Sequence, residues 1–529
     1  MTLTDKTKVE EIKANEDNPP GANKIGLLRE AVLKKRPVLR EIIEKRGAKS
    51  LFKYADEYAD VNLNDLIIDR QKEVLFTFQK EVAERLGEKV AEAAAKQLKK
   101  FYFISTADHH GPICHSFFLN SNLVTSICGL SQSPEDINYI IVFSCANVSF
   151  ANSSFPRGLL FHSYANGNLK LQQLGLFPNT SRIRQARVFG HAPYGINDVA
   201  RLEQRLAELR KNKEVSPEIG DKILSIVRRI YARPEALGAK NYSDQITKTN
   251  FLLWQKFFSA MEAKGPDLLY IELESMVSSL LIDHHLSADT IIHRVIFSLR
   301  YAEIFTKYFD GIEGGFSLEK DWGTYLFWAL PPGARYSQKM RRQGNFLVTT
   351  DGSYKLELKP EEIRRALIAR EIFPGTQLSL LVLSLYYGLK CLGGFCQVNY
   401  LTDMRHAYEK MLVEVGSDYG DLSILDILQT KELGEDLTIA FLEAPNGAVD
   451  LATGLDLFLY GDEQAWPILV EGAKKITVAE ALSIMMPDFY HIMYPEAARD
   501  PSLTRIKAGD IMKHNGLGKK ISPCVKIKN

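Results

Sequence analysis

The first hundred residues carry a helical pattern of hydrophobic positions after a polar start. Residues 1–23 are polar and include the string Asn-Glu-Asp-Asn-Pro-Pro-Gly, which predicts a flexible leader. From residue 24 to residue 100, leucine, isoleucine and valine recur at spacings of three and four among many Lys, Glu and Ala residues. This periodicity predicts an N-terminal helical layer whose charged side chains face water.

The pattern changes after residue 100, where short runs rich in aromatic and β-branched residues begin. Residues 101–106 (FYFIST) and 139–144 (YIIVFS) are typical of buried strands. Residues 158–174 predict a β-hairpin, because Asn166-Gly167 suits a two-residue type I′ turn. These three segments are the strongest strand signals in the chain.

Helical periodicity then dominates most of the remaining sequence. Residues 196–310 are expected to be almost entirely helical. Residues 345–359 predict a second hairpin that turns at Asp351-Gly352. Residues 376–415 are expected to form two helices separated by a Gly-Gly pair.

Together these elements predict a mixed α/β fold that is rich in helix. A small central sheet, containing the two short strands and the first hairpin, would be flanked by helices and joined by the N-terminal helical layer. The chain of 529 residues is too long for a single ordinary core. The expected division is a leader (1–23), the N-terminal helical layer (24–100), an α/β core carrying the candidate site (101–195), a helical region (196–330) and an α+β C-terminal region (331–529).

Composition narrows the class of protein. A hydrophobic content of 45% and a charged content of 25% are globular values, and the net charge of +1 gives no general attraction to nucleic acid or anionic membranes. The longest apolar run, within 376–394, is interrupted by Lys390 and is expected to be buried, not to span a membrane. Six cysteines without a C-x-x-C pair, and a charged N-terminus, indicate a reduced, cytoplasmic protein.

Titratable side chains gather where the first predicted strand ends. Asp108, His109 and His110 follow the run 101–106 directly, and His115 lies five residues further on. Ligands of open α/β sheets bind beyond the carboxyl ends of strands, and carboxylate with imidazole is a good ligand set for Zn, Mn or Fe. We therefore expect a divalent metal held by these four residues, with Asp108 and His109 also catalytic. The alternative is a polar turn whose histidines donate to backbone carbonyls.

The segment after the second predicted strand is rich in small hydrogen-bonding side chains. We expect it to form a wall of the substrate site, with Arg157 as a clamp for an anionic group. The hairpin adds His162, which would lie opposite Leu171 on the more apolar face and could equally be a satisfied core histidine. The candidate substrate-binding residues are Asn147, Asn152, Ser154, Arg157 and His162.

A thiol offers a second chemistry at the same place. Cys114 lies next to His115 and four residues after His110, and Cys145 ends the next predicted strand. Either could be a nucleophile activated by a nearby histidine, with Cys114 the catalytic candidate, although most free cysteines are buried and inert.

Three further clusters carry acidic, histidine or basic side chains. A second Asp-His-His, at residues 283–285, is read as a helix junction, with Ser287 as the N-cap of the next helix and Asp289 in its first turn. The arginines of residues 182–191 and the basic loop 331–345 could each hold an anion, or could be solvated surface. Neither a Walker A sequence nor a G-x-G-x-x-G after a strand is present.

These patterns favour a cytosolic enzyme acting on a small polar or anionic substrate by metal-assisted hydrolysis or group transfer. The first alternative is a metal-free Cys/His acyl or amidino transferase. The second is a non-enzymatic helical scaffold or ligand-binding protein. A small-molecule partner is expected, with no nucleic acid and no membrane, and homo-oligomerisation is left open.

Overall fold

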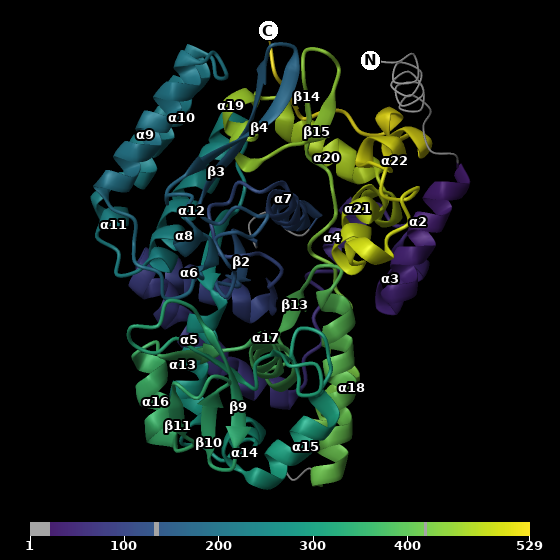
Figure 1. The fold of residues 1–529 in the computed structure, drawn as a ribbon. Coiled ribbons are helices and arrows are strands. Elements are labelled where there is room, and N and C mark those ends of the chain that lie inside the picture. Colours follow the sequence, from purple (N-terminus) through teal and green to yellow (C-terminus); the bar gives the residue numbers. More distant parts are fainter. Residues whose placement is uncertain (1–21, 132–136, 417–420, 529) are drawn as a thin grey trace, which may run out of the picture.

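The computed structural model describes residues 22–131, 137–416 and 421–528. The leader expected over residues 1–23 lies outside these ranges except for its last two residues. At the centre is a parallel sheet of four strands in the order β13-β1-β2-β5, seen in the middle of Figure 1. Its strands are β1 (Phe103–Ser105), β2 (Tyr139–Ser144), β5 (Asp267–Glu272) and β13 (Lys390–Leu392).

The central sheet divides the hydrophobic interior into two cores. Successive side chains of a strand point to opposite faces, so each buried strand must be apolar on both. One face carries Phe103, Ile140, Val142, Leu268 and Tyr270. The other carries Ile104, Ile141, Phe143, Leu269 and Ile271. This two-sided burial explains why β1 and β2 are continuous apolar runs, and it confirms both predicted strands.

Helices from the two ends of the sequence pack against each other. The N-terminal helices are α2 (Ala22–Lys35), α3 (Pro37–Arg46), α4 (Leu51–Asp56), α5 (Asp65–Leu86) and α6 (Glu88–Lys100). The C-terminal helices are α19 (Gly454–Tyr460), α20 (Ala465–Lys475), α21 (Val478–Met493) and α22 (Ala508–His514). Figure 1 shows α2 beside α21, so the two ends of the described chain share one layer.

The first hairpin has the predicted turn and register but not the predicted place. It consists of β3 (Gly158–Ala165) and β4 (Asn168–Gly175), and His162 pairs with Leu171. The expectation that this hairpin belongs to the central sheet is wrong, because β3 and β4 form a separate two-stranded sheet. The outer edge of β3 is covered by α19 instead, where Asp456 accepts a hydrogen bond from the backbone of His162 at 2.7 Å.

The region predicted as almost entirely helical contains the strand β5, which the sequence reading missed. Six residues of strand lie between two helices, and periodicity alone cannot separate so short an apolar run from a buried helix segment. The helices before β5 are α9 (Ile196–Lys211), α10 (Pro217–Ile226), α11 (Pro234–Leu237) and α12 (Tyr242–Ala260). Those after it are α13 (Leu273–Leu280), a π-helical turn (Leu281–His285), α14 (Ile291–Phe297) and α15 (Leu299–Phe309).

The second Asp-His-His is a helix junction, as expected, but its cap was assigned to the wrong residue. The triplet ends the π-helical turn that continues α13. Thr290, not Ser287, caps α14, accepting a hydrogen bond from the backbone of His293 at 3.1 Å. Asp289 therefore precedes the helix, where it pairs with Arg294.

A five-stranded sheet in the order β11-β10-β9-β8-β12 forms the lower part of Figure 1. Its strands are β8 (Phe327–Ala329), β9 (Gln338–Gln343), β10 (Phe346–Thr349), β11 (Lys355–Glu357) and β12 (Ile372–Pro374), with α16 (Pro360–Ile368) before the last. The antiparallel pair β10 and β11 confirms the second hairpin, and Gly352 in its turn has a φ of +71°.

The segment 376–415 is not simply two helices. It contains α17 (Thr376–Leu380), a π-helical stretch (Leu381–Tyr386), the strand β13 and then α18 (Gln397–Val415). β13 escaped prediction because it has only three residues and begins with a buried lysine. A three-stranded sheet near the C-terminus combines β14 (Phe441–Glu443), β15 (Val449–Leu451) and β16 (Val525–Lys526).

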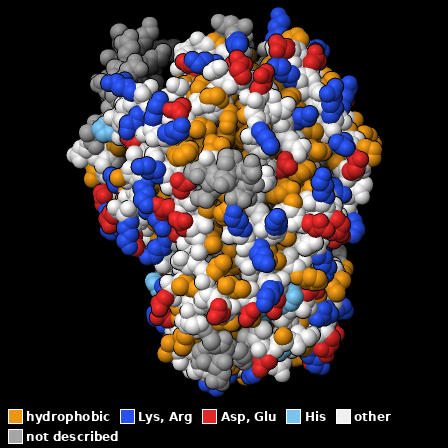
Figure 2. Space-filling view, turned by 180° about the vertical axis from the view of Figure 1, so that it is seen from behind, with side chains coloured by type: hydrophobic (Ala, Val, Ile, Leu, Met, Phe, Trp, Pro, Cys, Tyr) orange, Lys and Arg blue, Asp and Glu red, His pale blue; other side chains and the backbone are white. Residues whose placement is uncertain are grey.

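The surface mixes both signs of charge. Figure 2 shows lysine, arginine and acidic side chains interspersed over the rear face, with hydrophobic side chains exposed in a band along its middle. Among the described residues, no helix is both long enough and apolar enough to cross a membrane. The apolar run within 376–394 is buried, as expected.

Candidate functional site

A cavity of about 230 Å³ lies at the carboxyl edge of the central sheet. The chain steps from β1 to β2 and then to β5 on one side, whereas β13 joins on the other side of β1. Ligands of open α/β sheets bind at such a switch in strand order. Thr106 and Ala107, which follow β1, and Gly394 and Gln397, which follow β13, all line this cavity. The topology and the cavity thus point to the same place.

The Gly-Gly pair after β13 allows the backbone to approach the loop 432–436. A Cβ on Gly394 would lie 2.4 Å from the Oε2 of Glu435, a contact that any larger residue would have to relieve. Glu435 also lines the cavity. Close packing at a glycine therefore brings a carboxyl group to the wall formed by the start of α18.

On the opposite wall, His109 and Cys145 extend the pairing of β1 and β2 beyond the strand ends. They form a parallel bridge between backbones. The backbone N–H of Cys145 donates to the Asp108 carbonyl at 2.9 Å, and the backbone N–H of His110 donates to the Cys145 carbonyl at 2.8 Å. Residues paired in parallel register direct their side chains to the same face. Both side chains line the cavity. An imidazole and a thiol therefore share one wall.

Asn152 and Ser154 hold the His109 ring in a defined protonation state. The Oδ1 of Asn152 accepts the backbone N–H of Ser154 at 2.9 Å and lies 3.2 Å from His109 Nδ1. Because Oδ1 can only accept, Nδ1 carries the proton, and Nε2 keeps its lone pair. Burial lowers the pKa of His109 to about 4, although the Asn152 contact opposes the shift. At neutral pH the ring is in the form of a general base.

The thiol of Cys145 faces a carboxyl group that the sequence reading missed. Its Sγ lies 3.4 Å from Oε1 of Glu274, which also accepts the backbone N–H groups of Ala146 and Asn147 at 3.1 and 2.9 Å. Burial, followed by the charge of Glu274, raises the pKa of the thiol well above its ordinary value. Burial and the nearby Glu272 raise the pKa of Glu274 to about 7. The resting thiol is therefore protonated.

The wall formed by α18 and the loop 432–436 is acidic. Burial raises the pKa of Asp436 to about 7, and burial with the charges of Asp436 and Asp108 raises the pKa of Glu435 well above its ordinary value. Gln397 donates to Thr106 at 2.6 Å across the cavity. None of the described residues that line the cavity is a lysine or an arginine. The cavity suits a neutral or positively charged group better than the anion expected from the sequence.

The four predicted metal ligands point in different directions. Asp108 is buried and accepts from Asn122 at 2.8 Å, and burial raises its pKa to about 7. Both ring nitrogens of His110 are engaged, by Ser144 Oγ at 2.6 Å and the Ser243 carbonyl at 2.9 Å.

His115, the fourth predicted metal ligand, accepts the backbone N–H of Phe117 at its Nδ1, at 3.3 Å. Within the described part of the chain, no three His, Cys, Asp or Glu side chains are grouped to hold a metal ion. The Zn, Mn or Fe site stays a prediction that this arrangement does not favour.

The remaining predicted site residues separate into two groups. Asn152 and Ser154 support His109, and the buried Oδ1 of Asn147 lacks a hydrogen-bond partner among the described residues. Arg157 instead packs over the Phe155 ring, 4.5 Å from its centroid, and Cys114 is buried in the larger core.

His162 lies on the hairpin and pairs with Asp456, away from the residues that line the cavity. Two carboxyl groups were missed: Glu274, which contacts Cys145, follows the unrecognised strand β5, and Glu435, which lines the cavity, lies in a loop. The Gly-Gly pair after an apolar run was the one signal that could have led to this wall.

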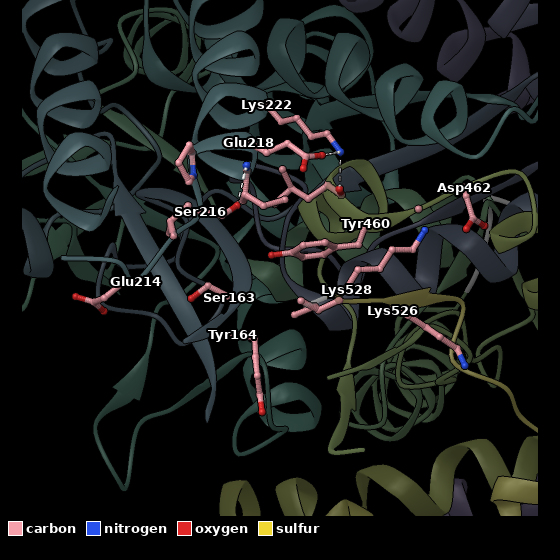
Figure 3. A pocket seen from close by; sticks show the side chains of 16 residues that line it. Ser163, Tyr164, Glu214, Ser216, Glu218, Lys222, Tyr460, Asp462, Lys526 and Lys528 are labelled. Atoms are coloured by element: carbon pink, nitrogen blue, oxygen red, sulfur yellow. Dashed lines mark hydrogen bonds and ion pairs between the residues drawn. The ribbon is translucent and has the colours of Figure 1, made fainter. Parts of the chain in front are cut away.

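A larger groove of about 750 Å³ lies between the hairpin, the start of α10 and the C-terminal strand. Figure 3 shows Lys222 reaching Glu218, with Glu214 and Asp462 on opposite sides of the groove. Its charges are mixed and mostly solvated, so it lacks the converging groups of the smaller cavity.

No protein-family model matches this chain, and no curated protein matches it either. The fold and the cavity define an α-rich α/β protein with a candidate site at the carboxyl edge of a parallel sheet.

Proposed function

We propose that this protein is an enzyme that transfers an amidino group of a small cationic substrate through Cys145, with His109 as general base. The observation that carries the proposal is the His109–Cys145 bridge, which places a thiol and an oriented, neutral imidazole on one cavity wall. A nucleophile, a base and a third group that orients the base form the usual constellation of covalent catalysis. Asn152 is the orienting group here.

The charge of the cavity favours amidino transfer over acyl transfer. The resting thiol is protonated and lies beside carboxyl groups, which disfavour a thiolate. A guanidinium or amidinium substrate would bring a positive charge into this cavity. That charge would favour loss of the proton that burial keeps on Glu435, pair with the resulting carboxylate and stabilise the thiolate at the moment of reaction. A neutral acyl substrate would supply no such charge.

The reaction then needs only groups of this chain and its substrates. Cys145 Sγ gives its proton to His109 Nε2, and the sulfur lone pair forms a bond to the amidino carbon. The bond from that carbon to the leaving amine breaks as the imidazolium returns the proton to nitrogen. An incoming amine or water attacks the same carbon, loses a proton to His109 and displaces Sγ, which regains the proton.

Two alkylating reagents that share the same leaving group test this proposal. Chloroacetamidine is a cation and chloroacetamide is its neutral counterpart. Cys396 lines the same cavity, but its Sγ accepts from Arg36 at 3.2 Å, so the neutral thiol 2-mercaptoethanol is the reference for charge. Peptide mass spectrometry should show a ratio of Cys145 to 2-mercaptoethanol labelling rates about tenfold higher with the cationic reagent, since about 1.4 kcal/mol of charge pairing gives that factor.

The His109→Gln variant should slow Cys145 labelling by about 10²-fold, a typical loss for a general base. His115→Gln is the matched control and should leave the rate unchanged. Equal ratios for the two reagents would exclude the cationic substrate. Labelling of Cys145 that is no faster than that of Cys396 and indifferent to His109→Gln would overturn the enzyme proposal and favour a non-enzymatic ligand-binding protein.

A further inference from the structure

Two basic segments that lie far apart in the sequence meet at a third cavity. Residues 182–192 and 330–337 together line a space of about 400 Å³. The first segment is tied to the loop after β2, because Val188 donates to the Val148 carbonyl at 3.0 Å and Phe189 donates to that of Ala146 at 2.9 Å. The second precedes β9. This volume is within the range of small-molecule sites.

The charge of this cavity is one-sided. Arg182, Arg187 and Arg335 line it, and none of the described residues that line it is an aspartate or a glutamate. Within the described part of the chain, no ion pair joins any of these three guanidinium groups to a carboxylate. Three arginines without a counter-charge on one concave surface are typical of a site for an anion.

Arg187 is the least solvated of the three. It is half-buried, and its Nη1 donates to the Asn147 carbonyl at 3.3 Å. Burial lowers the pKa of this guanidinium. A cation removed from water without a paired anion costs free energy, and a bound anion would offset that cost.

The rest of the lining adds a rigid floor and neutral donors. Phe189 stacks on Phe373 with ring centroids 4.0 Å apart, and the Arg370 guanidinium covers its ring at 4.1 Å. Tyr336 presents a phenol ring, and the buried Oγ of Ser337 has no hydrogen-bond partner among the described residues. A hydroxyl donor beside three guanidinium groups matches an anion with several oxygens.

We propose that this cavity binds the phosphate group of a small phosphorylated molecule. A carboxylate needs one guanidinium fork, whereas three arginines and a hydroxyl match the charge and the three free oxygens of a phosphate monoester. The site is separate from the cavity of His109 and Cys145, and the proposal does not depend on the reaction assigned to them.

Isothermal titration calorimetry of the full chain with inorganic phosphate, pyrophosphate and AMP tests this site. We expect binding in the millimolar range or tighter, weakened by added salt. Arg182→Ala and Arg335→Ala should each raise the Kd at least about tenfold, the effect of losing one charge-assisted fork. Both side chains are exposed, so these variants should fold normally.

Arg184→Ala is the matched control, because Arg184 lies on the same short helix as Arg182 but does not line the cavity. It should change the Kd less than about twofold. AMP binding more than about tenfold tighter than inorganic phosphate, with the difference lost in Tyr336→Ala, would identify a nucleotide ligand. Equal affinities would identify recognition of phosphate alone. Equal losses from Arg184→Ala and Arg335→Ala, or no binding of any probe, would overturn the proposal.

Discussion

His162 and Asp456 make two hydrogen bonds to each other across the outer edge of the first hairpin. The backbone N–H of His162 donates to Oδ1 and the ring Nδ1 donates to Oδ2, each at 2.7 Å. Asp456 has no exposed surface, and its Oδ2 also accepts the backbone N–H of Thr453, the N-cap residue of α19. This pair fastens β3 to the C-terminal helices, so a histidine that the sequence offered as a substrate ligand connects two parts of the fold.

The His162–Asp456 pair should stabilise the folded protein at neutral pH and lose that stabilisation at alkaline pH. Burial lowers the pKa of His162, but Asp450 and Asp456 more than offset it and raise the pKa to about 9. The stabilisation is complete below the ordinary histidine pKa and disappears as pH rises through about 9. The pH-dependent part should be about 3 kcal/mol. Urea unfolding should show His162→Gln less stable than wild type by this amount at pH 6, with the gap narrowing by pH 10.

The exposed His406→Gln variant is the control and should change the free energy of unfolding by less than about 0.5 kcal/mol. A gap for His162→Gln that stays constant between pH 6 and pH 10 would contradict the ion pair.

The buried carboxyl of Asp108 should destabilise the folded protein at neutral and alkaline pH. Burial raises its pKa to about 7, against hydrogen bonds from Asn122, Tyr270 and Ser105. A carboxyl whose pKa is raised on folding destabilises the protein above that pKa, and the penalty disappears below the ordinary aspartate value. Asp108→Asn keeps the shape without the charge. It should therefore be more stable than wild type at pH 8, by up to about 4 kcal/mol, and not at pH 4.

Thermal unfolding at the two pH values measures this difference. Asp310→Asn, at an exposed position, is the control, and its stability relative to wild type should be the same at both pH values. Loss of stability in Asp108→Asn at pH 8 would show that the carboxylate is held in its charged form.

Local signals in the sequence predict much of this fold. The type I′ turn at Asn166-Gly167 sets the register of the first hairpin, and a continuous apolar run identifies β2. The position of Asp108 and His109 at the end of β1 also predicts the edge of the sheet where the cavity lies. Each of these features depends on residues close together in the chain.

The features that could not be predicted depend on contacts between distant segments. β5 lies between long helical patterns and β13 has only three residues, so periodicity distinguishes neither from helix. Both nevertheless determine the strand order and so the switch point beside β1. Glu435 reaches the cavity from a loop more than three hundred residues after His109. The direction of His110 away from the cavity follows from Ser243 on α12, which no local pattern reveals.

The missed strand β5 should be among the most sensitive parts of the core. Leu269 has no exposed surface and packs in the second core with the helices after β5. Leu269→Ala should lower the free energy of unfolding by about 2–5 kcal/mol, the cost of a lost side chain and a residual cavity. Leu171→Ala on β4, where the side chain is 45% exposed, is the matched control. Its effect should be below about 1 kcal/mol in the same urea titration. Similar losses in both variants would contradict the central place of β5.

Arg370 and Glu272 form an ion pair in which the carboxylate is buried, and a double-mutant cycle should show their coupling. Nη2 of Arg370 lies 2.9 Å from Oε1 of Glu272, whose carboxylate is 1% exposed. Burial raises the pKa of Glu272, but Arg370 and His110 more than offset it and lower the pKa to about 2. The stabilisation is therefore present above the ordinary glutamate pKa and is lost as pH falls through about 2.

Arg370→Ala leaves an uncompensated buried carboxylate and should cost about 3–5 kcal/mol at pH 7. Adding Glu272→Gln to Arg370→Ala should recover a large part of that loss, because it removes the unpaired charge. Arg365→Ala, which breaks an exposed pair with Glu371, is the matched control and should cost less than about 1 kcal/mol. If the double variant is no more stable than Arg370→Ala, the two residues are not coupled, and Arg370 stabilises the fold through its packing on Phe189 alone.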